Sequence, residues 1–139
     1  MAKSTFLQDK INNHVLDATA YTKPATVYIG LWTAVLAAGS HGGTAGEITY
    51  TGYARVAVTN DGSSFAASSA GLITNTAAIT FPSPTGNGNA PAVSCGVFDG
   101  NSGTSADNLL YFATISSLTV NNGDAAPFIG IGNFDHQEG

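Results

Sequence analysis

Hydrophobic residues between positions 6 and 16 recur at intervals of one or four positions, which is close to the spacing of one face of a helix. This stripe consists of Phe6, Leu7, Ile11, Val15 and Leu16. Either Ser4 or Thr5 can cap its first turn. We therefore predict a short amphipathic helix over residues 4–17. Pro24 follows, and because the residue before a proline avoids the helical region, the chain is expected to continue in extended form.

From residue 27 onward the pattern changes to the alternation that is typical of β-strands. Residues 27–33 are apolar on both faces, with Val27 and Ile29 on one face and Trp32 on the other, which favours a central strand. Further strands are predicted at residues 53–59, 72–75, 78–81, 92–99, 109–115 and 127–134, with residues 118–120 continuing or following the strand at 109–115. The strands at 92–99 and 109–115 are expected to pair in antiparallel fashion.

About seven short strands, joined by glycine, proline and asparagine turns, predict an all-β fold: an antiparallel β-sandwich or barrel with a short N-terminal helix. The 139 residues correspond to one domain. We expect residues 1–139 to form a single β domain, in which residues 1–20 are the N-terminal helix and arm. Residues 135–139 are expected to form a mobile polar tail. The glycine-rich residues 38–46 and the residues 82–89 are expected to be exposed loops.

The charge of the chain argues against nucleic acid as a partner. Four basic residues face nine acidic ones, and a net charge of −5 repels a phosphate backbone. No stretch approaches the ~20 apolar residues of a membrane span, and no signal-peptide core is present at the N-terminus. We therefore expect a soluble protein that is made in a cytoplasm and has neither nucleic acid nor membrane as a partner.

The three histidines are the candidate bases of an enzyme, and none lies in a catalytic motif. His14 falls near the end of the predicted helix, where it favours the helix dipole. His41 lies in the glycine-rich loop, as a solvated residue, a metal ligand or a contact residue, and His136 lies in the predicted tail. We expect no enzymatic activity and no catalytic residues.

Metal and cofactor sites have little support. The single cysteine, Cys95, permits neither an internal disulfide nor a multi-cysteine metal site, and it is expected to be buried. The turns at residues 99–103 and 121–124 contain oxygen side chains but lack the distal glutamate of a calcium loop. We expect no metal and no cofactor.

Two other functions remain open on the residues alone. Five aromatic residues are candidates for a surface that stacks on sugars, although packing is their commoner role: Tyr21, Tyr28, Trp32, Tyr50 and Tyr53. A hydrolase that acts on cell-wall sugars would need two carboxylates about 5 to 10 Å apart across a cleft. Most of the nine acidic residues lie in turns or near the chain ends.

Seven segments, in a fixed order along nearly the whole chain, carry a resemblance to known proteins. They are NHVL at 13–16, AYTKPATVYIGLWT at 20–33, GYARVAV at 52–58, NTAAITFP at 75–82, CGVFD at 95–99, NLLY at 108–111 and NGD at 122–124. Together they resemble a family of short bacteriophage virion proteins, often labelled tail-fibre proteins and related to capsid decoration or cement proteins. Family members often carry a tryptophan before the strand that holds Cys95, where this chain has Asn87-Gly88-Asn89. The resemblance brings no catalytic residues.

The resemblance implies a structural protein of the phage virion, assembled in the cytoplasm of the host bacterium. Our first hypothesis is a capsid decoration or cement protein that stabilises the head by binding its outer surface. Its expected partners are the major capsid protein or another virion protein, and a second or third copy in a homo-oligomer. The alternative hypothesis is a tail-fibre or tail-tip module that binds host surface glycans.

The residues predicted at the protein interface come from the helix face and from the glycine-rich loop. They are Phe6, Leu7, Ile11, Val15 and His41. The helix face contacts a neighbour only if the sheet of its own domain leaves it uncovered. Packing within the domain is the alternative.

Overall fold

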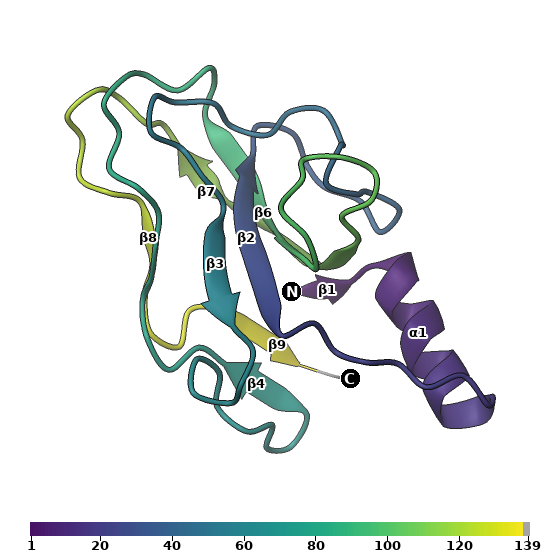
Figure 1. The fold of residues 1–139 in the computed structure, drawn as a ribbon. Helices are drawn as coiled ribbons and strands as arrows, with labels where there is room; N and C mark the ends of the chain where they lie inside the picture. Colours follow the sequence, from purple (N-terminus) through teal and green to yellow (C-terminus); the bar gives the residue numbers. More distant parts are fainter. Residues whose placement is uncertain (138–139) are drawn as a thin grey trace.

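A five-stranded antiparallel sheet forms the centre of the computed structural model, which describes residues 1–137 (Figure 1). Its strands, in spatial order, are β1 (Ala2–Lys3), β7 (Leu109–Leu118), β6 (Ala92–Phe98), β2 (Thr26–Trp32) and β3 (Val56–Thr59). The predicted antiparallel pairing of the strand at 92–99 with the strand at 109–115 is confirmed in β6 and β7. The central position predicted for residues 27–33 is also confirmed, because β2 has a strand on each side.

Two small two-stranded sheets and one helix complete the described fold. β4 (Leu72–Thr74) pairs with β9 (Asp135–Gln137), and β5 (Ile79–Thr80) pairs with β8 (Phe128–Ile129). The sheets do not close into a barrel, so the all-β prediction is confirmed in its sandwich form. The seven predicted strands correspond to β2 through β8, most of them with shorter bounds.

The predicted helix is confirmed as α1 (Thr5–Leu16), and Ser4 is its N-cap. The Ser4 hydroxyl accepts a hydrogen bond from the Leu7 N–H at 3.1 Å and donates one to the Leu109 carbonyl oxygen. Ser4 is fully buried, so the cap also ties the start of the helix to β7.

The prediction of a mobile tail is wrong for residues 135–137. They form β9, and the His136 side chain is only 6% exposed. The His136 ring lies 4.7 Å from the Tyr111 ring, and its Nδ1 atom lies 2.8 Å from the Met1 carbonyl oxygen. Backbone pairing with β4 and this ring contact hold a polar segment in place. The remaining predicted tail residues, 138–139, lie outside the described residues.

Both faces of the main sheet are covered. On one face, the larger core cluster includes Val27, Ile29 and Leu31 of β2 and Val97 of β6. On the other face, a smaller cluster is formed by Trp32, Leu36, Phe98 and Leu109. The second cluster includes Leu36 of the loop at residues 33–47, so it helps to hold this loop on the sheet.

Candidate interaction site

The structure divides the predicted helix interface between the core and the surface. Leu7 is 4% exposed and belongs to the larger core cluster, so it contacts its own domain. Phe6 and Ile11 are half-buried against the same cluster, because α1 packs on β7. Val15 is 69% exposed and Leu16 is 85% exposed. The apolar surface that α1 offers to a neighbour is therefore its C-terminal end.

Four further large apolar side chains are exposed at other places on the domain: Val35, Leu72, Phe128 and Ile131. Phe128 belongs to β8, and Figure 1 shows β8 and α1 at opposite sides of the main sheet. Single exposed apolar residues are common, but the consecutive residues Val15 and Leu16 form a local apolar surface. The domain thus presents apolar surface in more than one direction.

His41 lies in an ordered loop instead of a freely solvated one. Its N–H donates to Thr44 Oγ1 at 2.9 Å, and its Nδ1 accepts from the Gly43 N–H at 3.1 Å. The backbone of His41 also forms an isolated bridge with Asn108, which belongs to the neighbouring loop. The half-buried His41 side chain is therefore held at the junction of two loops.

Arg55 fastens these two loops to each other. Its Nη2 donates to the Gly42 carbonyl oxygen at 2.9 Å, and its Nη1 donates to the Gly100 carbonyl oxygen at 3.3 Å. Two carboxylates complete the set: Glu47 accepts from Nε and Nη2 at 2.8 Å each, and Asp107 accepts from Nη1 at 2.9 Å. One buried guanidinium therefore connects residues that are distant in the sequence.

Aromatic rings cover the face of the same guanidinium. Its central carbon lies 4.7 Å from the centre of the Phe98 ring and 5.3 Å from that of the Trp32 ring. Burial on its own lowers the pKa of Arg55, but the hydrogen bonds and charges of Glu47 and Asp107 outweigh burial and raise this pKa. The guanidinium is thus a permanent cation in a fully partnered site.

The two carboxylates of this site are also fully engaged. Asp107 accepts hydrogen bonds from the Ser102 hydroxyl and from the N–H groups of Ser102 and Gly103. Burial alone raises the pKa of Asp107, but these hydrogen bonds and the one from Arg55 hold it below its ordinary value. Glu47 also accepts from the Tyr53 hydroxyl at 3.0 Å. Glu47 and Asp107 therefore serve to hold Arg55.

Sequence reasoning missed this site. The signal that could have indicated it is Arg55 itself, the one arginine in a chain with four basic residues. A lone arginine between apolar strand residues must find acceptors when it is buried. The sequence did not reveal which carboxylates would supply them.

The other chemical candidates are dispersed. His14 is exposed on α1, and its Nδ1 atom accepts a hydrogen bond from the Tyr21 N–H at 3.2 Å. Trp32 is fully buried and Tyr50 is 5% exposed, so the five aromatic residues do not form one exposed surface. Among residues 1–137, no three histidine, cysteine, aspartate or glutamate side chains are grouped so as to hold a metal ion. No helix in this part of the chain has the length and apolar character to cross a membrane.

Comparison with known protein families gives a match over nearly the whole chain. The sequence model of a family described as podophage GP4 fiber I protein gp80 matches residues 2–137. The chain belongs to this family. None of the curated proteins compared matches the chain. Membership of a phage fibre family makes the protein a structural component of the bacteriophage virion, and it confirms the resemblance to tail-fibre-type proteins.

Proposed function

We propose that this protein is a fibre component of the phage particle that acts by binding other virion proteins and copies of itself, without catalysis. The observation that carries the proposal is the uncovered apolar surface at the end of α1 of a domain whose described buried polar side chains are all partnered. Among the described residues, every buried side-chain nitrogen and oxygen has a hydrogen-bond partner. The buried polar groups are therefore engaged within the domain, whereas Val15 and Leu16 are removed from unfavourable contact with water when a partner covers them.

The second candidate is a capsid decoration or cement protein on the outer surface of the head. It is favoured by the build of the described residues, which form one compact sandwich with no elongated shaft. Many identical copies on a lattice add avidity to contacts that are individually modest. Both candidates use the same physical means, which is burial of apolar surface against another virion protein.

Imaging of the phage particle separates the two candidates. A small number of copies grouped near the tail supports the fibre role. Copies repeated regularly over the head lattice would overturn it in favour of the cement role.

Self-association tests the surface on which both candidates depend. Sedimentation of the purified chain is expected to reveal a dimer or trimer, and Leu16→Asp is expected to weaken it because a charge replaces an exposed apolar side chain. Gln8→Asp, on the exposed surface of the same helix, is the matched control. Equal loss of association in both variants would show that added charge, and not the apolar helix end, is responsible.

A further inference from the structure

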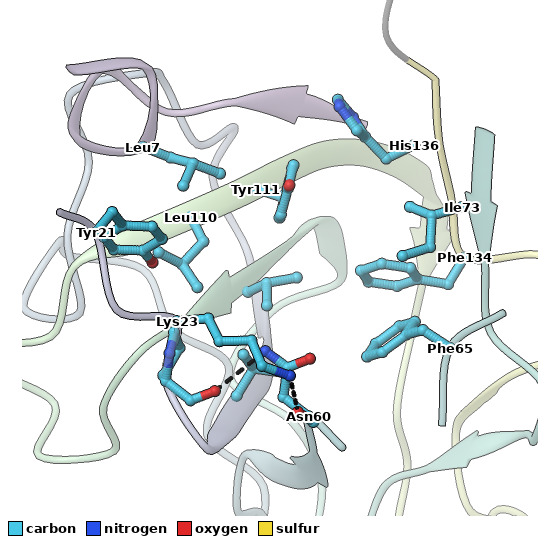
Figure 2. A pocket seen from close by; sticks show the side chains of 13 residues that line it. Leu7, Tyr21, Lys23, Asn60, Phe65, Ile73, Leu110, Tyr111, Phe134 and His136 are labelled. Carbon is cyan, nitrogen blue, oxygen red and sulfur yellow. Dashed lines mark hydrogen bonds between the residues drawn. The ribbon is translucent and has the colours of Figure 1, made fainter. Parts of the chain in front are cut away.

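An apolar cavity of about 170 Å³ lies where the main sheet, α1 and the β4–β9 ribbon meet (Figure 2). Its deep walls are the buried side chains of Leu7, Val97, Leu110 and Phe134. Figure 2 shows the aromatic ring of Phe134 and the side chain of Ile73 on one side, facing Leu110 and Tyr21 on the other. For comparison, an apolar cavity of about 150 Å³ accommodates a benzene ring.

The positively charged side chain of Lys23 lies at the solvent-exposed end of this cavity. Lys23 is exposed, and its ammonium group donates to the Asn60 carbonyl oxygen at 2.5 Å. The neighbouring carboxylate of Asp61 instead accepts from the N–H and hydroxyl of Ser63, at 2.9 and 2.6 Å. Within residues 1–137, Lys23 forms no ion pair within 4 Å, although its charge acts on the exposed Asp61 carboxylate and helps to lower the pKa of that group. Two of the donor positions of its ammonium group are thus available to an incoming anion.

We propose that this cavity binds a small amphiphilic monocarboxylate, with its ring or short alkyl chain among Leu7, Val97 and Phe134 and its carboxylate on Lys23. The apolar walls favour burial of a hydrocarbon group, and the cation fixes which end of the ligand faces solvent. The net charge of the whole chain is −5, so general attraction of anions is not expected. A preference for a carboxylate would therefore result from the local positive charge of Lys23. This site is independent of the surface at the end of α1.

Three probes that share one hydrocarbon skeleton test the charge preference: phenylpropionate, phenylpropanol and phenylpropylammonium. Each is titrated into the full chain and followed by calorimetry. Phenylpropionate is expected to bind about tenfold more tightly than phenylpropanol, and phenylpropylammonium more weakly than either, because the cation attracts one end group and repels the other. Equal affinities for the three probes, or no binding of any, would overturn the proposal.

Two substitutions connect the binding to the two ends of the cavity. Lys23→Met keeps an unbranched side chain and removes its charge, so the affinity for phenylpropionate is expected to fall to that for phenylpropanol, which stays unchanged. Ile73→Phe narrows the cavity and is expected to weaken binding of all three probes. Leu72→Phe, at an exposed neighbouring position that does not line the cavity, is the matched control.

Thermal unfolding is measured for each variant. If Ile73→Phe does not fold, the comparison of Lys23→Met with the native chain decides the proposal, because Lys23 is exposed. A native preference for phenylpropionate that survives in Lys23→Met would overturn the assignment of the carboxylate to Lys23.

Discussion

Gly30 of β2 lies directly opposite Gly96 of β6, and neither position has room for a methyl group. A Cβ atom on Gly30 would lie 2.7 Å from the Trp32 ring, and one on Gly96 would lie 2.7 Å from the Phe98 ring. These two rings lie 4.9 Å apart and cover the Arg55 guanidinium. The glycine pair therefore creates the space in which the rings and the cation that joins the loops can pack.

Gly96→Ala is expected to destabilise the fold by about 1–3 kcal/mol, because the added methyl group overpacks a closed site. Urea unfolding measures the change, and the fluorescence of Trp32, the only tryptophan of the chain and fully buried, reports the transition. Gly39→Ala is the matched control, since a Cβ there meets no atom within 4 Å. Equal stability of the two variants would contradict this account of the glycine pair.

Ser4→Ala is expected to destabilise the protein by roughly 1–2 kcal/mol, because it removes the N-cap of α1 and leaves the buried Leu109 carbonyl oxygen without its hydroxyl donor. The free energy of unfolding from urea denaturation measures it. Thr5→Ala changes an exposed side chain at the next residue and is expected to have little effect. If both substitutions have the same small effect, the cap does not stabilise the fold as proposed.

Arg55→Met is expected to destabilise the protein by about 3–5 kcal/mol, since it leaves two carboxylates without their cation in a largely buried site. Adding Glu47→Gln and Asp107→Asn removes those charges and is expected to restore part of the loss. Denaturant unfolding of the single and triple variants checks both statements. A triple variant less stable than Arg55→Met would show that lost hydrogen bonds outweigh the unpaired charges.

The stability of the protein is expected to fall in acid partly through Asp107, whose pKa in the folded state lies below its ordinary value of 3.8. The unfolded chain therefore binds a proton first as the pH falls. The contribution of Asp107 is complete above the ordinary pKa and is lost as the pH falls through the folded-state pKa. Unfolding free energies measured from about pH 6 to pH 3 should depend less steeply on pH in Asp107→Asn than in the native chain. Parallel curves would contradict this.

Most elements of the fold could be predicted because their signals are local. Alternation of apolar residues located β2 and β6, and a capping serine before a helical stripe located α1. The strands β1 and β9 could not be found in this way, because they are only two and three residues long and are defined by partners far along the chain, as when His136 pairs with Ile73. Their stability comes from contacts between residues far apart in the sequence, which a local sequence pattern does not indicate.

The interaction surface was predictable only in part for a related reason. Periodicity placed Leu7 and Val15 on one face of the helix, but the packing of α1 on β7 covers the first and leaves the second exposed. The Arg55 site was not predictable, since Glu47 and Asp107 reach it through loops whose course depends on the finished sheet. Strand patterns specify which residues are apolar, whereas the tertiary fold decides which of them remain uncovered.

The thiol of Cys95 is expected to react slowly in the native protein and to report how the sheet opens. Cys95 is 4% exposed, and burial raises the pKa of its thiol to about 11 despite the opposing charge of the N-terminus. At about pH 8, roughly one thiol in a thousand is then ionised, and even that fraction is shielded from reagent. Alkylation in urea should be much faster than in buffer.

Measuring Cys95 alkylation in Gly96→Ala distinguishes global unfolding from local opening. If alkylation requires global unfolding, the native-state rate in Gly96→Ala should rise by the factor that corresponds to its loss of unfolding free energy. Gly39→Ala should leave the rate unchanged. A rate in Gly96→Ala equal to that of the native chain, despite lower stability, would mean that reagent reaches Cys95 through a local opening near β6 that does not involve the glycine pair. Mass spectrometry of timed samples gives the rates and distinguishes these outcomes.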